Sequence, residues 1–214
     1  MERYNIAIDG PSAAGKSTIS KQLAKKLGMT HLDTGAMYRC LALKAIQQGI
    51  SQQNEKDLVK CLNETEIRLE SDRVFLDGEE VTKIIREPEV SIGASNISKW
   101  AKVRQEMVAR QQFLAKEKGF IMDGRDIGTV VLPDAKLKIF LVASVKARAK
   151  RRFLEEQQKN SSITLEEVVK AMEERDRQDE TRSASPLKQA RDAVRIDCSD
   201  MTIEEVVEKV CSYL

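Results

Sequence analysis

Gly10-Pro11-Ser12-Ala13-Ala14-Gly15-Lys16-Ser17 is the stretch that decides the fold of this sequence. It matches GxxxxGK[ST] in full, a pattern in which a glycine-rich loop turns backbone N–H groups toward phosphates at the start of a helix. The apolar run Tyr4–Asp9 before it predicts a buried strand. Apolar residues spaced by four in Lys16–Leu27 predict an amphipathic helix after it. Because strand, loop and helix occur in the required order, we expect a phosphate site rather than a glycine-rich turn with a solvated lysine.

Several positions of this loop have a specific chemical role. Lys16 supplies a mobile positive charge for the β- and γ-phosphates, and Ser17 offers a hydroxyl to Mg²⁺. We expect the loop and the first helical residues to bind ATP: Gly10, Pro11, Ser12, Ala13, Ala14, Gly15, Lys16, Ser17 and Thr18. Asp123 follows the apolar run Phe120–Met122, so it should lie at the carboxyl end of a buried strand, where open α/β sheets bind ligands. We interpret it as a partner of the magnesium or its water shell; an ordinary turn aspartate is the competing interpretation.

Strands and helices alternate along the rest of the chain. The patterns predict strands at residues 30–33, 137–142 and 194–196 and helices at 36–48, 91–98, 103–116 and 164–180, with Ser144 and Thr202 capping two more helices. Alternating apolar residues over 67–81, around Asp77-Gly78, predict an antiparallel hairpin. The expected fold is therefore α/β: a parallel P-loop sheet wrapped by helices, with a small antiparallel insert.

Composition excludes several classes of protein. The 214 residues are 41% hydrophobic and 33% charged, as in an ordinary globular domain. The net charge of +2 gives no general attraction to nucleic acid or to an anionic membrane, so an anionic ligand needs local basic clusters. The cysteines form no CxxC pair and His31 is the only histidine, which argues against zinc and for free thiols in a reducing compartment. We expect a cytoplasmic protein that binds neither nucleic acid nor membrane.

The remaining motifs bear on the phosphate acceptor. Asn54-Glu55-Lys56-Asp57 has the wrong order for the guanine-reading motif of a GTPase. Arginine has a planar fork that suits phosphate, and four arginines occur in different segments: Arg39, Arg86, Arg104 and Arg125. Arg175 and Arg182 lie two helical turns apart, so we expect them to share one helix face with Asp179 between them. We expect His31 to be a surface or packing residue. An acceptor that is itself a phosphate already carries an anionic oxygen and needs little deprotonation. Alignment of the two substrates and neutralisation of their charge would then suffice for catalysis.

Longer stretches resemble the bacterial cytidylate kinases. They are the phosphate loop, Leu32–Arg39 (LDTGAMYR), Asp123–Val131 (DGRDIGTVV), Glu174–Asp176 (ERD) and Arg182–Leu187 (RSASPL). The resemblance implies a single kinase domain over 1–214, with core at 1–62, 100–155 and 187–214, a monophosphate-binding insert at 63–99 and a helical lid at 156–186. It also implies MgATP as phosphoryl donor and CMP or dCMP as acceptor.

The resemblance also implies roles for individual residues. Catalysis would fall to Lys16, Arg125, Arg175 and Arg182. CMP would be bound by Thr34, Arg39, Ser95, Arg104, Arg125, Asp126, Asp179 and Arg182. Gln178 departs from the pattern, since some relatives have a further lid arginine there. We expect a monomer. Open alternatives are a kinase for another acceptor, such as UMP, AMP or shikimate, and a nucleotide-dependent regulator without turnover.

Cytosine has an amino donor at C4 beside acceptors at N3 and O2, whereas uracil has an acceptor at C4. We expect Asp126 to accept from the cytosine amino group, with Arg104 and Ser95 as donors. In the competing interpretation, Asp126 only orients Arg125 through an ion pair.

Overall fold

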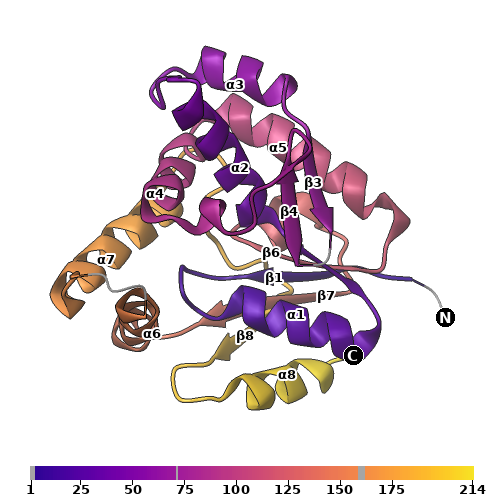
Figure 1. Cartoon of the computed structure of the whole chain (residues 1–214). Coiled ribbons are helices and arrows are strands. Elements are labelled where there is room, and N and C mark those ends of the chain that lie inside the picture. The colour runs from indigo at the N-terminus through magenta and orange to yellow at the C-terminus, as the bar shows by residue number, and fades with distance from the viewer. Residues whose placement is uncertain (1–2, 71, 159–161) are drawn as a thin grey trace.

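The computed structural model describes residues 3–70, 72–158 and 162–214. Its centre is a parallel sheet in the order β2-β6-β1-β7-β8 (Figure 1). The strands are β1 (Ile6–Asp9), β2 (Thr30–Asp33), β6 (Phe120–Gly124), β7 (Leu137–Val142) and β8 (Val194–Asp197). β1 is therefore central, which is why its first three residues are apolar and all four of its residues are buried.

Helices cover both faces of this sheet. Ile6 and Ile8 of β1 pack in a cluster with residues of α1 (Lys16–Leu27) and α8 (Ile203–Cys211). Figure 1 shows these two helices together on one side of the sheet, in the lower half of the view. Ala7 points to the opposite face, toward the one-turn π-helix η3 (Ile127–Val131). Because successive strand residues alternate between faces, one short strand joins two apolar layers.

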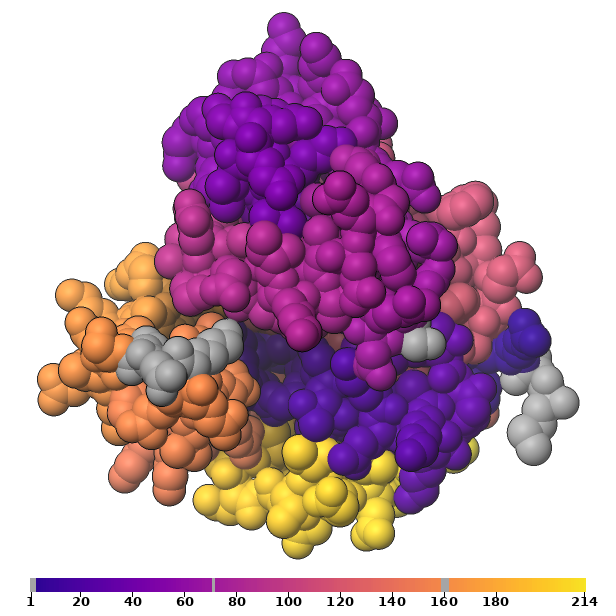
Figure 2. Space-filling view, viewed as in Figure 1, coloured from indigo at the N-terminus to yellow at the C-terminus, as the bar shows by residue number. Residues whose placement is uncertain are grey.

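A second apolar core lies beside the sheet. It is built by α2 (Thr34–Gln47), α3 (Glu55–Asn63), α4 (Pro88–Ile97), α5 (Ala101–Leu114), the 3₁₀ turn η1 (Ile84–Arg86) and an antiparallel sheet. The 3₁₀ turn η2 (Ala115–Glu117) packs instead in the cluster that contains Ala7. The antiparallel strands are β3 (Ile67–Glu70), β4 (Arg73–Leu76) and β5 (Glu79–Glu80). Figure 2 shows this unit stacked above the N-terminal part of the chain.

α6 (Val145–Gln157) and α7 (Leu165–Thr181) form a third unit at one side of the sheet (Figure 1). Its own apolar contacts are few: Ala149, Val168 and Met172 make a small buried cluster. Ser144 accepts a hydrogen bond from the backbone of Ala147 and so caps α6, while Thr164 and Glu167 form a capping box on α7.

The expected fold class is confirmed: a parallel sheet wrapped by helices, with a small antiparallel unit. Two strands and the first helix have the predicted bounds. Thr164–Glu167 and Thr202–Glu205, which the sequence predicts as capping boxes, both form. Other helices begin earlier than predicted. Asp33 caps α2 through the backbone N–H of Ala36, and Pro88 occupies the first turn of α4, where its missing N–H costs nothing.

Helix α3 was not predicted. Its cap is Asn54, which accepts from the backbone of Asp57, and Glu55 and Asp57 suit the positive end of the helix dipole. The apolar cluster around it includes α2 and α5, which lie outside the range 63–99 expected for the insert. Residues 159–161 of the expected lid lie outside the described residues. Among the helices described, none has both the length and the apolar character to cross a bilayer.

Candidate active site

The carboxyl ends of three adjacent strands bring acidic side chains to one edge of the sheet. In register, Asp33 of β2 pairs with Asp123 of β6, and Gly124 pairs with Asp9 of β1. Asp9 and Asp123 are buried, with 4% and 3% of their surface exposed. The predicted position of Asp123 at the end of a buried strand is confirmed.

The phosphate loop follows β1 at this edge. A Cβ atom on Gly10 would lie 2.2 Å from the carbonyl oxygen of Leu141, so only glycine lets the loop leave β1 so close to β7. Gly15 and Ala13 adopt left-handed backbone conformations, with φ of 91° and 55°. α1 begins directly after Gly15, so its first N–H groups point toward the loop.

Lys16 lies inside this loop and donates from Nζ to the carbonyl of Pro11 at 2.7 Å. Burial, and then the nearby positive charge of Arg125, lower the pKa of Lys16 to about 7. An anion bound beside Lys16 would stabilise the charged form of this buried lysine.

Two residues that the sequence did not single out hold the loop in place. Arg148 of α6 donates to the carbonyl of Ser12 at 3.2 Å and forms an ion pair with Asp176 of α7 at 2.6 Å. The thiol of Cys198 donates to the carbonyl of Ala14 at 3.3 Å. α7 is thereby connected to the phosphate loop through one buried guanidinium.

Oxygen atoms suited to a divalent cation meet beside the loop. The Ser17 hydroxyl donates to Asp123 Oδ2 at 2.9 Å, and His31 Nε2 lies 2.6 Å from Asp123 Oδ1. The expectation of a surface or packing role for His31 is wrong in part: its side chain is 7% exposed and contacts the site carboxylate. Its position next to Asp123 depends on the pairing of β2 with β6, which local sequence does not reveal.

Asp33 organises two arginines near the insert. Arg39 and Arg86 both donate to Asp33 Oδ2 at 2.8 Å. Burial opposes the charge on Asp33, but the guanidinium groups of Arg39 and Arg86 outweigh it and hold the pKa of this carboxyl well below its usual range. The carboxylate therefore stays ionised and fixes the orientation of both guanidinium groups.

Asp179 plays the same role at the end of α7. Arg125 Nε donates to its Oδ2 at 2.7 Å and Arg182 Nη1 donates to its Oδ1 at 3.3 Å. α7 ends at Thr181, so Arg182 is not on the helix with Arg175 as expected, but its side chain still reaches Asp179. Burial and then the charge of Arg125 lower the pKa of Arg175 to about 10.

Asp126 bonds to Arg104 rather than to Arg125. Arg104 Nη2 donates to Asp126 Oδ2 at 2.5 Å, and both side chains are almost fully buried. The guanidinium also lies 5.4 Å from the ring centre of Tyr38. The hydroxyl of Ser95 on α4 bonds to Gln178 of α7 at 3.2 Å, so the position that departs from the family pattern contacts the insert.

Several buried donors here have no hydrogen-bond partner. Within the described residues they include atoms from separate segments: Tyr38 Oη, Arg39 Nε, Arg104 Nε, Arg175 Nε and Arg182 Nη2. Leaving a buried donor unsatisfied costs about 1–3 kcal/mol, and more for a charged group. Converging donors of this kind are suited to an anionic ligand, which would satisfy them.

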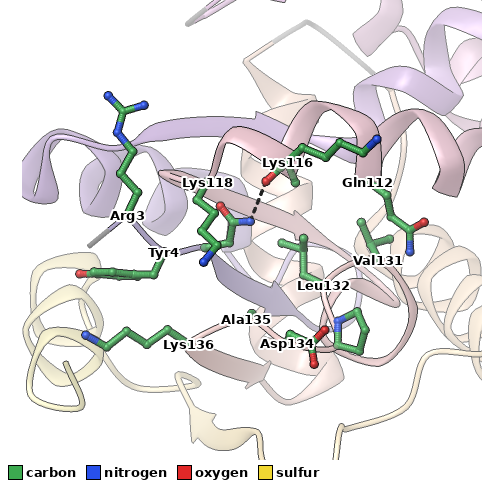
Figure 3. A pocket seen from close by; sticks show the side chains of 13 residues that line it. Arg3, Tyr4, Gln112, Lys116, Lys118, Val131, Leu132, Asp134, Ala135 and Lys136 are labelled. Atoms are coloured by element: carbon green, nitrogen blue, oxygen red, sulfur yellow. Dashed lines mark hydrogen bonds between the residues drawn. The ribbon is translucent and has the colours of Figure 1, made fainter. Parts of the chain in front are cut away.

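A hollow of about 550 Å³ lies elsewhere, lined in part by residues that precede the amino ends of β1 and β7 (Figure 3). Its floor includes the buried side chains of Val131 and Leu132, and exposed side chains such as Arg3, Lys116 and Lys136 surround it. No residue of the phosphate loop or of the arginine cluster lines it, so it is separate from the candidate active site.

Two groups of donors thus face the same edge of the sheet, one built from the loop backbone and one from arginine side chains. This arrangement accommodates two anions side by side, which defines the class: a P-loop kinase whose acceptor carries negative charge. The sequence profile of the cytidylate kinase family matches residues 6–214, and the chain belongs to this family of nucleoside monophosphate kinases.

Individual relatives support this family membership. The chain is 53% identical over 214 residues to a cytidylate kinase of Caldicellulosiruptor bescii, covering 98% of this chain and 95% of the relative. It is 51% identical to the cytidylate kinase of Enterococcus faecalis, with the same coverage.

Solved structures support the fold. A gluconokinase from Sinorhizobium meliloti aligns with a TM-score of 0.52 and 13% identity over 99% of this chain and 93% of its own. A shikimate kinase from Bacteroides thetaiotaomicron aligns with a TM-score of 0.52 and 12% identity over 99% and 98%.

Proposed function

We propose that this protein transfers the γ-phosphoryl group of ATP to CMP and dCMP, giving ADP and CDP or dCDP. One observation carries the proposal beyond family membership. Unpartnered guanidinium atoms come from α2, α5 and the end of α7, in Arg39, Arg104, Arg175 and Arg182. The charge of Arg125 acts on both Arg175 and Lys16, so this cluster lies beside the phosphate loop. A dianionic monophosphate and the phosphates of ATP together satisfy such a cluster.

On the donor side, Gly10–Thr18 would bind the phosphates of ATP through loop N–H groups and Lys16. Ser17 and Asp123 would hold Mg²⁺, directly or through water, because a hydroxyl and a carboxylate oxygen 2.9 Å apart are hard oxygen ligands of the kind it prefers. The ion, when bound, neutralises charge on the β- and γ-phosphates. His31 holds Asp123 from its other oxygen.

On the acceptor side, Arg39, Arg125 and Arg182 would bind the phosphate of CMP, and Arg104 and Asp126 its base. Asp179 fixes Arg125 and Arg182 and faces the same site. Thr34 donates its hydroxyl to the Asp123 carbonyl at 2.8 Å, which fixes the start of α2 beside the site.

Catalysis would be alignment and charge neutralisation. Lys16, Arg125, Arg175 and Arg182 would surround the transferring phosphoryl group, and the acceptor phosphate would attack with its own oxygen. We place the monophosphate-binding insert at 63–99 and the lid at 156–186. Closure of the lid over both nucleotides would exclude water and suppress hydrolysis of ATP.

A coupled assay of ADP release across nucleoside monophosphates tests this function. We expect rapid release with CMP and dCMP, much slower release with UMP or AMP, and none above background with shikimate. Slow release that no acceptor stimulates would instead identify a nucleotide-dependent regulator. Preference for UMP would show that the base assignment is wrong.

A further inference from the structure

Gln178 makes a two-point contact between α7 and α4. Its side-chain nitrogen Nε2 donates to the backbone carbonyl of Ser95 at 2.9 Å. Its oxygen Oε1 lies 3.2 Å from the hydroxyl oxygen of the same serine. Both contacts involve Ser95, so the amide holds the serine backbone and its side chain at once.

The carbonyl of Ser95 determines the orientation of this amide. A carbonyl only accepts hydrogen bonds, so the NH₂ group of Gln178 must face it; the flipped amide would bring two acceptors together. The Ser95 carbonyl lies in the last turn of α4, where helix carbonyls seek partners outside the helix, and Ser98 Oγ also donates to it at 2.9 Å.

With the amide fixed, the proton of the Ser95 hydroxyl is fixed too. Gln178 Oε1 accepts, so the hydroxyl must donate its single proton to it. The remaining lone pairs of Ser95 Oγ can then only accept from a ligand. Sequence reasoning assigned Ser95 as a donor to the base; this contact supports the opposite polarity.

Ser95 belongs to the same hydrogen-bond network as Asp126. Arg104 donates to the Ser98 carbonyl at 3.2 Å and to Asp126 Oδ2 at 2.5 Å, and Ser98 in turn donates to Ser95. An exocyclic amino group carries two N–H donors. A pocket with the Asp126 carboxylate and the Ser95 lone pairs has one acceptor for each.

We propose that Gln178 is a specificity-determining residue that acts through Ser95: it makes the serine an acceptor and so favours a base with an amino group over one with a carbonyl. The inference rests on the proposed function. Uracil would place its C4 oxygen against two acceptors, and a mismatch in a site built for hydrogen bonds discriminates strongly.

The test is the ratio of kcat/KM for CMP to that for UMP. Gln178→Met keeps the length of the side chain but frees the Ser95 hydroxyl to rotate and donate. We expect the ratio to fall about fivefold, mostly because UMP improves, since one hydrogen bond is worth about 1 kcal/mol. Ser95→Ala should lower the ratio similarly, and the double variant should lower it no further than Ser95→Ala alone.

Other outcomes overturn the inference. Equal losses on CMP and UMP would show that Gln178 only fastens α7 to α4, and additive effects in the double variant would show that it does not act through Ser95. Glu180→Met, on an exposed residue of the same helix, is the matched control and should leave the ratio unchanged. Gln178→Leu repeats the test if the methionine variant folds poorly.

The result also separates this inference from the proposed function. Wild-type protein that shows no CMP-stimulated ADP release contradicts the function itself. A CMP-selective wild type whose ratio survives Gln178→Met contradicts only the role of Gln178.

Discussion

At the residue scale, two carboxyls at the same sheet edge respond oppositely to their surroundings. Burial raises the pKa of Asp9 to about 6, although backbone N–H groups of Gly128 and Ile127 donate to it at 2.7 and 2.8 Å. Asp33 is also buried, but Arg39 and Arg86 hold its pKa low. An arginine counter-charge keeps Asp33 ionised, whereas two backbone N–H groups do not fully offset the burial of Asp9.

Comparison of the wild type with Asp9→Asn should reveal the raised pKa of Asp9 in the pH dependence of the free energy of unfolding. The folded pKa of Asp9 lies above its unfolded value of 3.8, so its ionisation opposes folding above pH 6 and this cost disappears as the pH falls toward 4. The free energy of unfolding of the wild type, relative to Asp9→Asn, should therefore rise by about 2–3 kcal/mol between pH 7 and pH 4. Urea unfolding at several pH values measures it; a difference that is flat with pH would contradict the raised pKa.

Lys16→Ala should lower phosphoryl transfer by on the order of 100- to 1000-fold, because it removes a positive charge from the developing charge on the phosphates. The fold should survive, since Lys16 Nζ bonds only to the Pro11 carbonyl among the described contacts. Steady-state kinetics and circular dichroism check both statements. Near-normal turnover by a folded variant would be incompatible with the assigned role.

Local sequence predicts residues at this scale when the chemistry lies within a motif. The phosphate loop and the position of Asp123 follow from contiguous residues and their flanking patterns. Arg148, which holds the Ser12 carbonyl from 136 residues away, does not. His31 likewise reaches Asp123 only through strand pairing, and no periodicity in its own segment indicates that neighbour.

At the scale of elements, the sequence predicts the start of a helix best where a capping residue or capping box precedes it. The Thr164–Glu167 and Thr202–Glu205 boxes mark the starts of α7 and α8. Asn54 caps α3 equally well, and the cap followed by Glu55 and Asp57 is a helix-start signal within the same four residues that resemble a guanine-reading motif in the wrong order. The order β2-β6-β1 depends on long-range pairing and was not predicted beyond a parallel sheet.

The charged second half of α7 supports a prediction for Arg175. Its guanidinium is repelled by Arg125, and its Nε lacks a partner among the described residues. A buried guanidinium with a free N–H group can stabilise the negative charge that develops on the phosphoryl group during transfer. Arg175→Ala should therefore lower kcat by at least about 100-fold while changing CMP affinity little. Calorimetric CMP binding beside kinetics tests this; weak binding with normal turnover would assign Arg175 to ground-state binding instead.

At the scale of the whole molecule, the site lies where separately packed units meet. The sheet with α1 and α8, the unit built by α2 to α5, and the α6–α7 pair each have their own apolar cluster. Polar contacts hold the α6–α7 pair to the other units: Gln178 to Ser95, Asp179 to Arg125, and Arg148 of α6 to the Ser12 carbonyl. Because apolar packing lies within the units and polar contacts join them, the units can move relative to one another. A nucleotide that bonds to several units would restrain this motion.

Hydrogen exchange should show this restraint directly. Without ligand, amides of the second half of α7 should exchange much faster than those of β1 and β6, because the buried apolar residues of α7 are Val168 and Met172, both in its first half. A ligand at 100 times its Kd stabilises the bound form by about 2.7 kcal/mol, so CMP at that excess should slow exchange in α7 up to about 100-fold. α8, which packs against α1 away from the arginine cluster, is the internal control and should change little. If α7 were as protected as β1 in the free protein, or indifferent to CMP, closure of a mobile lid over the acceptor would be excluded, and α7 would instead be a fixed wall of the site.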